Sequence, residues 1–297
     1  MFFFLLFLFG LIIGSFLNVL VFRYDIEGAL FDFKKLSGRS RCAHCKQQLK
    51  WYELIPLLSF LIQKGKCRVC RASLSLQYPL VEFASGLLCM FVPLFLTSFY
   101  GIRIDLFGVG EVAFWYYLLT FLWTLVFLVL LTIVVIDIRH YIIPDELNIA
   151  LLVLGCGITA LTLSHLSLLP SFRFSFLAHY ALLFPLSGSV IVSHLIALGM
   201  GVLVFGGLSV LSGGRAMGFG DVKLASATAF LFGWPDMTLI IILSFIIGGL
   251  TGIYALVRYG KTMKDKLPFA PFFVCAIFLV FFFAPQIIGG YFALFGA

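Results

Sequence analysis

Two aspartates stand where the chain otherwise contains almost no charge, and both adjoin long apolar runs. Asp221 ends the motif Gly218-Phe219-Gly220-Asp221 at the mouth of one apolar segment, and Asp137 lies at the end of another. An ionised carboxylate near hydrocarbon depth is costly, so it persists chiefly where it faces water, a partner or a substrate. If folding brings the two together, like charges in close proximity cannot both ionise, and the pair can share one proton. One carboxylate then acts as a base toward water and the other as an acid, which is the chemistry of an aspartic protease.

The residue types alone leave three interpretations of this aspartate pair open. It can be a catalytic dyad, a relay for ion or proton translocation, or a set of structural acids that form salt bridges to Arg139 or Lys223. Gly218 and Gly220 favour the first, since glycines permit the backbone to bend or to approach a substrate strand closely. A peptidase needs that access because a helical peptide must be unwound before water reaches its scissile bond.

Three further acids lie at or beside apolar runs. We expect Glu146 to be a first-turn residue favoured by the helix dipole, and Asp145, which follows Pro144, to cap the same helix. Glu82 and Lys223 are predicted either to tune and position the site or to make an interhelical polar contact.

Four cysteines form a second group, with metal-binding spacing. Cys42-Ala43-His44-Cys45 is followed after 21 residues by Cys67-Arg68-Val69-Cys70. Two Cys-x-x-Cys pairs can present four thiolates, Cys42, Cys45, Cys67 and Cys70, in the tetrahedral arrangement that a structural Zn²⁺ prefers. A reducing cytoplasm disfavours disulfides, and His44 is expected to be a surface residue rather than a ligand. We therefore predict a structural zinc site that folds its small surrounding segment.

Membrane helices must position these residues, because the composition excludes a soluble fold. The 297-residue chain is 62% hydrophobic and 11% charged, with a mean hydropathy of +1.14, whereas soluble domains are about 45–50% apolar and about 25% charged. We predict an all-α polytopic membrane protein with about eight transmembrane helices. The apolar runs are 1–22, 78–99, 114–137, 147–164, 188–211, 222–234, 237–258 and 268–294. The run 222–234 is short for a span and is expected to be a half-helix supported by protein neighbours.

Dense charge sets residues 23–77 apart from this pattern. The predicted domains are a first transmembrane helix at 1–22, a cytoplasmic zinc-binding insert at 23–77, and a transmembrane domain at 78–297 that carries the aspartate pair. The segment Tyr52–Leu61 is too short to span and is expected to pack under the cysteines or against the membrane surface. Residues 168–186 are expected to be interfacial or re-entrant, and a ninth span there stays open.

The distribution of basic residues predicts the orientation of the chain. With the N-terminus outside, all of the 20 Lys and Arg except Arg103 and Arg173 fall on the cytoplasmic side, as the positive-inside rule requires. Both aspartates then lie at cytoplasmic helix ends. The net charge of +7 is explained by this topology and by attraction to anionic lipid, so no nucleic-acid partner is expected.

Six motifs run in order along nearly the whole chain. They are Gly14-Ser15-Phe16-Leu17-Asn18-Val19, the double Cys-x-x-Cys, Tyr78-Pro79-Leu80-Val81-Glu82, the stretch from Asp137 to Asp145, Gly218-Phe219-Gly220-Asp221-Val222-Lys223-Leu224, and Pro268-Phe269-Ala270-Pro271-Phe272. Together they resemble the motifs of the type IV prepilin peptidases, inner-membrane aspartic proteases of type IV pilus and type II secretion systems.

The resemblance implies that Asp137 and Asp221 are the catalytic pair and that the chain lies in a bacterial inner membrane. It implies prepilin and pseudopilin precursors as substrates, with a short basic leader cut after Gly and before an apolar helix. It also implies N-methylation of the newly exposed residue from S-adenosylmethionine.

Two features of the chain depart from the family pattern. Tyr24-Asp25 stands where many members have Leu-Pro, and the linker between residues 165 and 190 is long and aromatic. No Gly-rich nucleotide loop is visible, so methyl transfer rests on the resemblance alone. The alternatives are a peptidase without methyltransferase activity and an ion- or proton-coupled transporter, which would give no role to the cysteine insert.

Overall fold

The computed structural model describes residues 1–25, 30, 38–100, 111–164, 175–184, 186, 189–215, 217–259 and 267–294. Within these residues the regular structure is helical, and the extended pairings are two isolated bridges, Arg41 with Gln48 and Lys66 with Ser73. The predicted all-α fold is therefore confirmed. The chain divides into two compact units, Met1–Ile104 and Asp105–Ala297, called unit 1 and unit 2 below. The predicted division at residues 22 and 77 stays a prediction.

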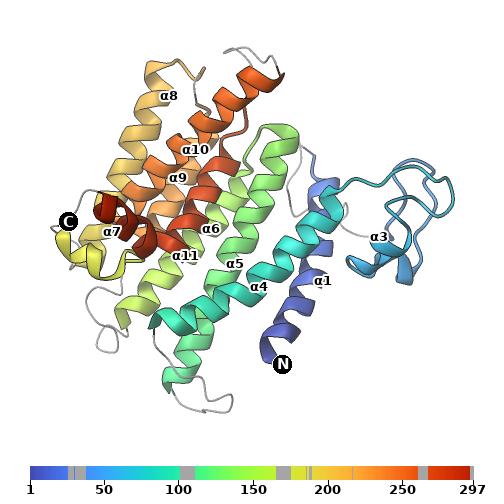
Figure 1. Cartoon of the computed structure of the whole chain (residues 1–297), viewed down its shortest axis with the longest axis horizontal. Helices are drawn as coiled ribbons and strands as arrows, with labels where there is room; N and C mark the ends of the chain where they lie inside the picture. Colours follow the sequence, from blue (N-terminus) through green and yellow to red (C-terminus); the bar gives the residue numbers. More distant parts are fainter. Residues whose placement is uncertain are drawn as a thin grey trace. The chain divides into compact units, whose positions relative to one another are not determined.

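Two long helices pack along each other in unit 1 (Figure 1). They are α1 (Phe2–Arg23) and α4 (Gln77–Tyr100). Small residues make the close contact possible, since a Cβ at Gly10 would lie 2.6 Å from the Ser85 carbonyl oxygen and one at Gly14 2.6 Å from the Glu82 Cα. Asn18 Nδ2 donates a hydrogen bond across the same interface to the carbonyl oxygen of Tyr78, at 3.1 Å. This bond adds a polar contact between the two helices.

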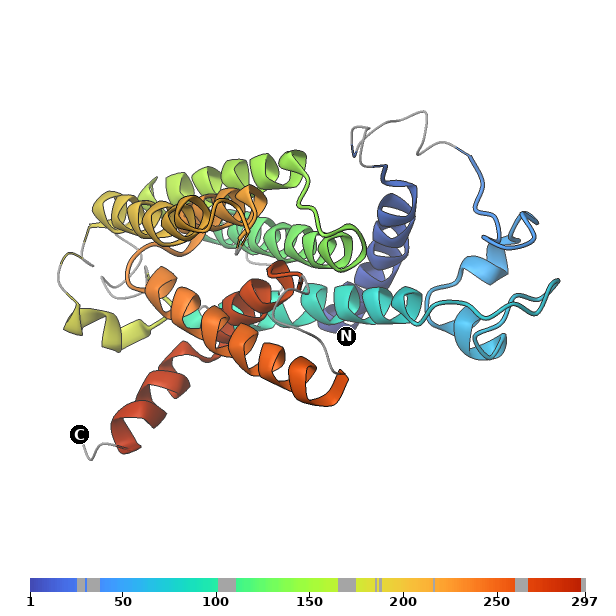
Figure 2. The same cartoon turned by 90° about the horizontal axis from the view of Figure 1, so that it is seen from above.

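The insert lies between the end of α1 and the start of α4, and Figure 2 shows its short helices beyond the tip of α4. These helices are η1 (Trp51–Leu54) and α3 (Leu58–Ile62), which together occupy the short apolar segment predicted at 52–61. Their side chains remain largely exposed, with Trp51 at 78% and Ile62 at 71%. Apolar side chains this exposed are compatible with the expected contact to a membrane surface.

Unit 2 is built from the remaining helices of the described residues (Figures 1 and 2). They are α5 (Glu111–His140), α6 (Asp145–Ser164), η4 (Ala178–Leu183), α7 (Val190–Gly201), the π-helical η5 (Val202–Gly206), α8 (Gly207–Leu211), α9 (Phe219–Phe232), α10 (Asp236–Tyr259) and α11 (Ala270–Leu294). α9 packs between α6 and α7, while α11 contacts both α10 and α5. The core position of α9 follows from its small buried residues, among them Ala225, Ala227 and Ala229.

Seven helices of the described part are long and apolar enough to cross a membrane. They are Phe2–Arg23, Gln77–Tyr100, Phe114–His140, Asp145–Ser164, Val190–Leu211, Asp236–Arg258 and Ala270–Leu294. The remaining predicted run, 222–234, folds as α9, which has 14 residues and rests on protein neighbours. Of the segment predicted to be interfacial at 168–186, residues 175–184 contain η4, and 165–174 lie outside the described residues.

A buried carboxylate fastens the η4 segment to α10. Asp236 is fully buried and accepts hydrogen bonds from Ser175 Oγ at 2.5 Å and from the backbone nitrogens of Phe176 at 2.9 Å and Leu177 at 3.3 Å. The neighbouring core is aromatic, with Trp123 and Phe176 rings in edge contact at 5.3 Å. Sequence reasoning missed Asp236, because nothing in its surroundings distinguishes it from an ordinary first-turn acid.

Candidate active site

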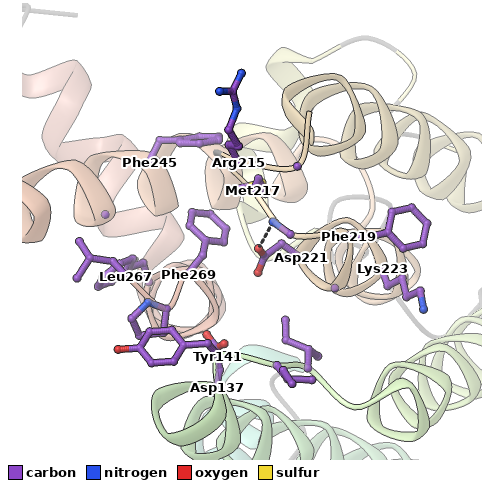
Figure 3. A pocket seen from close by; sticks show the side chains of 18 of the residues that line it. Asp137, Tyr141, Arg215, Met217, Phe219, Asp221, Lys223, Phe245, Leu267 and Phe269 are labelled. Atoms are coloured by element: carbon purple, nitrogen blue, oxygen red, sulfur yellow. Dashed lines mark hydrogen bonds between the residues drawn. The ribbon is translucent and has the colours of Figure 1, made fainter. Parts of the chain in front are cut away.

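A pocket of about 700 Å³ lies in unit 2 where α5 ends and where α6, α9 and α11 begin. Its volume is within the range of substrate-binding sites, about 300–1,000 Å³. Both predicted aspartates line it, Asp137 from the last turn of α5 and Asp221 from the first turn of α9 (Figure 3). The fold therefore brings together two acids that lie 84 positions apart in the sequence.

Asp137 is 5% exposed and is held by the start of another helix. Its Oδ2 accepts a hydrogen bond of 3.1 Å from the backbone nitrogen of Ala270, the first residue of α11. The first amide groups of a helix have no partner within the helix and carry partial positive charge, so they suit an acceptor carboxylate. The motif around Ala270 thus contributes a backbone donor that fixes one oxygen of Asp137.

Asp221 is half-buried and caps its own helix. One carboxylate oxygen accepts a hydrogen bond of 3.2 Å from the backbone nitrogen of Gly218, drawn as the dashed line in Figure 3. Burial, together with the negative charge of Asp137, raises the pKa of Asp221 to about 6, and the Gly218 N–H opposes this rise. The negative charge of Asp137 therefore opposes ionisation of Asp221, as expected for two acids that line one pocket.

The two glycines of the motif are not required by the chain's own packing. Gly218 is extended, with φ −75° and ψ 155°, and Gly220 lies within α9. A Cβ at Gly220 would lie 3.5 Å from Ile143 Cβ, and one at Gly218 would lie 3.7 Å from Asp221 Oδ2, both ordinary contact distances. The expectation that these glycines admit a substrate strand stays a prediction.

Lys223 pairs with a third acid rather than with the aspartate pair. Its ammonium nitrogen lies 2.7 Å and 2.8 Å from the two carboxylate oxygens of Asp145 and 5.3 Å from the ring centre of Phe219. Asp145 is the first residue of α6, so its side chain ties the start of α6 to the first turn of α9. The predicted role of Asp145 as a helix cap stays a prediction, and the ion pair with Lys223 is a contact that the sequence did not indicate.

Glu82 belongs to unit 1, where it connects the insert to α4. The side chain is 8% exposed, and Oε2 accepts a hydrogen bond of 2.8 Å from the backbone nitrogen of Leu57. Its predicted role in supporting the aspartate pair stays a prediction.

Several residues that line the pocket escaped the sequence analysis as individual candidates. The side chains labelled in Figure 3 include Tyr141, Arg215, Met217, Phe245, Leu267 and Phe269. Tyr141 and Phe269 fall inside two of the six motifs, which were the available signal. Arg215, Met217 and Leu267 come from loops, and Phe245 comes from the middle of α10, with no distinctive spacing.

The four cysteines of the insert converge in unit 1. Their sulfur atoms all lie within 4.8 Å of one another, with Cys42 Sγ and Cys70 Sγ 3.9 Å apart. Zinc–sulfur bonds of about 2.3 Å in a tetrahedron place sulfurs about 3.8 Å apart, and all four cysteines are free of disulfides. Backbone N–H groups, chiefly that of Cys45, lower the pKa of Cys42 to about 6, which favours the thiolate that metals bind. The residues present fit a zinc ion.

The two halves of this cluster have the same local fold. Residues 40–49 and 65–74 make equivalent backbone contacts, displaced by 25 positions, and Lys46 and Arg71 share a left-handed conformation, with φ of 58° and 59°. The matched hydrogen bonds are Cys42 N to Gln47 O with Cys67 N to Ala72 O, and Lys46 N to Cys42 O with Arg71 N to Cys67 O. Paired turns of this kind present the two sulfurs of each Cys-x-x-Cys on one side.

The fold and the site define a multi-pass membrane protein with two interacting carboxylates in a pocket at the helix ends. The chain belongs to the type IV leader peptidase family. The model of that family matches residues 124–253, and a model described as the bacterial peptidase A24 N-terminal domain matches residues 8–96. This confirms the resemblance drawn from the sequence motifs and makes the chain a membrane peptidase.

Curated relatives match along almost the whole chain. A protein of Stutzerimonas stutzeri named prepilin leader peptidase/N-methyltransferase is 31% identical over 95% of this chain and 91% of its own length. Proteins of the same name from Aeromonas salmonicida (strain A449) and Bacillus subtilis (strain 168) are 30% and 29% identical, over 93% and 97% of this chain and 89% and 96% of their own lengths. No solved structure matches the chain.

Proposed function

We propose that Asp137 and Asp221 are the catalytic pair of an aspartic endopeptidase that removes the short basic leader of prepilin and pseudopilin precursors. The observation that carries the proposal is the shared pocket, which α5 lines with Asp137 and α9 with Asp221. The third acid that lines it, Asp145, is paired with Lys223. The names of the curated relatives support the substrate class.

The mechanism divides two roles between the pair. The ionised carboxylate takes a proton from the attacking water, while the protonated carboxyl donates a hydrogen bond to the scissile carbonyl. Ala270 N–H and Gly218 N–H each hold one oxygen of one acid, so the pair is fixed before substrate arrives and does not have to be ordered during the reaction.

The Lys223–Asp145 ion pair supports this geometry. It joins α6 and α9 beside the pocket, and through α9 it restrains the turn that carries Asp221. Asp145 is the first residue of α6, the helix that packs along α9, so the ion pair joins the starts of two packed helices.

The orientation of the chain follows from connectivity and charge. We place the N-terminus outside a bacterial inner membrane and the pocket on the cytoplasmic side with the insert, since the basic residues concentrate in the segments that would then be cytoplasmic. Prepilin leaders are basic and cytoplasmic in the family that the sequence resembles, so this side gives them access to the pocket.

The same protein is proposed to methylate the new N-terminus, as the relatives' names indicate. When bound, S-adenosylmethionine supplies the methyl group for the amine that cleavage exposes. Zinc held by Cys42, Cys45, Cys67 and Cys70 would stabilise the insert, because four sulfur ligands leave no open coordination position for catalysis.

The test is cleavage of a purified pilin-like precursor by the native chain and by the variants Asp137→Asn and Asp221→Asn. Asparagine preserves shape and can still accept the backbone hydrogen bonds, so both variants should fold, insert and fail to cleave. A folded Asp221→Asn chain with substantial cleavage would refute the assignment and shift weight to a proton- or ion-coupled transporter, for which flux across sealed vesicles would then be measured.

A further inference from the structure

The loop that leaves α5 contains a tyrosine in an unusual backbone conformation. Tyr141 follows His140, the last residue of α5, and its φ of 55° lies in the left-handed region. Its backbone nitrogen donates a hydrogen bond of 2.8 Å to the carbonyl oxygen of Asp137. Glycine or asparagine usually occupies this position after a helix, because a Cβ is strained there. A bulky aromatic residue in this conformation is therefore an outlier that needs an explanation.

Packing within the chain does not explain the tyrosine. Its side chain is 53% exposed, and among the described residues it has neither a hydrogen-bond partner nor a stacked ring. By contrast, Phe245 and Phe269, two other aromatic residues of the pocket, pack against the fully buried ring of Phe205, at centroid distances of 5.7 Å and 5.6 Å. The backbone and the core would thus accept a smaller residue at the position of the tyrosine.

The side chain of Tyr141 instead belongs to the candidate active site. It lines the pocket of about 700 Å³ that contains both aspartates. In Figure 3 its ring points toward the side of the pocket where Leu267 lies, away from Lys223. Only four positions separate Tyr141 from Asp137. A chain bound across the aspartates would therefore pass next to this ring.

A peptide in this pocket has backbone groups that need partners. Its helix must be unwound before water reaches the scissile bond, and N–H and C=O groups released from helical hydrogen bonds cost free energy when they are buried unpaired. A phenol hydroxyl can both donate and accept a hydrogen bond, and its ring can cover an extended chain. A tyrosine side chain therefore suits the backbone of a bound peptide, whatever its sequence.

The other polar side chains that line the pocket are already engaged. Lys223 is paired with Asp145, and Arg215 Nε donates a hydrogen bond of 3.2 Å to the carbonyl oxygen of Ser212. The aspartate pair is held by backbone N–H groups and is assigned to the attacking water and the scissile carbonyl. Among the described polar side chains of the pocket, the hydroxyl of Tyr141 is the one without a partner.

We propose that Tyr141 is a substrate-binding residue of the peptidase. Its ring covers the precursor chain next to the scissile bond, and its hydroxyl forms a hydrogen bond with a peptide group there. The inference deepens the proposed function and rests on it. The strained backbone is then explained by the need to hold an aromatic side chain in the pocket. Tyr141 contributes to binding rather than to bond cleavage, because the aspartate pair already supplies the base and the acid.

An exposed tyrosine at a helix end has a second interpretation, as an anchor at the membrane–water interface, where tyrosine is common. An anchor contributes to insertion and stability and is neutral for cleavage. Glycine at the same position removes the ring and relieves the strained backbone. The two roles therefore predict opposite effects of Tyr141→Gly on stability and on cleavage.

Cleavage of a pilin-like precursor by the purified full-length protein, with thermal unfolding of the same samples, separates the two roles. Tyr141→Gly should unfold at the temperature of the native chain or above it. Its kcat/KM should fall about tenfold or more, through a raised KM with kcat retained, because it loses binding shared by the ground state and the transition state. Tyr141→Phe keeps the ring and loses the hydroxyl, so its kcat/KM should fall about two- to tenfold.

Two control variants make the matching changes outside the pocket. Ala178→Gly also replaces a residue in the left-handed region, with φ of 51°, and Tyr254→Phe removes the hydroxyl of another exposed tyrosine. Neither residue lines the pocket, so both variants should keep the native KM and kcat. Binding of the uncleaved precursor gives a readout without turnover. Added to Asp221→Asn, the change Tyr141→Gly should weaken this binding about tenfold.

Native KM and kcat in Tyr141→Gly would overturn the proposal. A fall in kcat with KM unchanged would also overturn it, because the tyrosine would then act in the chemical step. A marked loss of thermal stability with native cleavage would favour the membrane anchor instead. These outcomes leave cleavage by the native chain intact. If the native chain fails to cleave, or if folded Asp221→Asn still cleaves, the proposed function itself fails, and the role of Tyr141 fails with it.

Discussion

Replacing Asp221 by asparagine should make the protein more stable at neutral pH even though it removes a proposed catalytic group. Burial and the charge of Asp137 raise the pKa of Asp221 from 3.8 to about 6. The folded state therefore holds this proton more tightly than the unfolded state does. The associated stability is fully present below about pH 4 and is lost as pH rises through about 6.

The size of the effect follows from the shift. A difference of about 2 pKa units at about 1.36 kcal/mol each gives about 3 kcal/mol, and the partial exposure of Asp221 reduces this to about 1–3 kcal/mol. Asparagine avoids the free-energy cost of an ionised carboxylate at this buried position, because it never ionises. Its side-chain oxygen can still accept the hydrogen bond from Gly218 N. The free energy of unfolding of Asp221→Asn should therefore equal that of the native chain near pH 4. By pH 7 it should exceed the native value by the full difference.

Thermal unfolding in one detergent, from pH 4 to pH 8, measures the difference. Asp145→Asn is the control, because it removes the exposed ion pair with Lys223 and should lower stability at pH 7 by about 0.2–1 kcal/mol. The two substitutions thus have opposite signs at the same pH. A gain for Asp221→Asn that is absent at pH 7, or equally large at pH 4, would refute the electrostatic reasoning.

Three further outcomes are expected. The double variant of Asp137→Asn and Asp221→Asn should cleave a precursor no more slowly than either single variant, since groups that act as one unit are strongly non-additive; a further large loss in the double variant would argue for independent roles. Cys42→Ser should lose bound zinc, measured by elemental analysis, and make the insert protease-sensitive while the membrane helices stay intact, because zinc binding is largely folding energy for such modules; full metal content would contradict this. Reporter fusions at Arg139 and Arg215 should both report cytoplasm, and opposite locations would be incompatible with the pocket.

The sequence predicted what composition and spacing control. Long apolar runs form helices, because within a bilayer the backbone groups must hydrogen-bond to one another. The spacing of the four cysteines alone predicted their cluster. The aspartate pair was predicted from the rarity of charge near Asp137 and Asp221, and the shared pocket brings the two acids together.

What the sequence could not provide was the identity of long-range partners. The donor for Asp137 is the amide of Ala270, and a backbone N–H has no signature in the sequence. The ion pair of Asp145 was missed for a related reason, because its partner Lys223 lies 78 positions away in the sequence. Asn18 Oδ1 is buried without a hydrogen-bond partner among the described residues, and this too can be recognised only from the positions of its neighbours.

The brevity of α9 has a consequence for the supply of water. Its 14 residues extend about 21 Å at about 1.5 Å per residue, whereas the hydrocarbon layer is about 30 Å thick. A helix this short, flanked by α6 with 20 residues, leaves about 9 Å of bilayer thickness that its own backbone does not cross, and Asp221 stands at one of its ends. Because α9 packs between α6 and α7, protein rather than lipid borders the missing length, and the pocket that Asp221 lines can hold water there. The hydrolytic water is then supplied through the protein, so its supply should not depend on acyl-chain length.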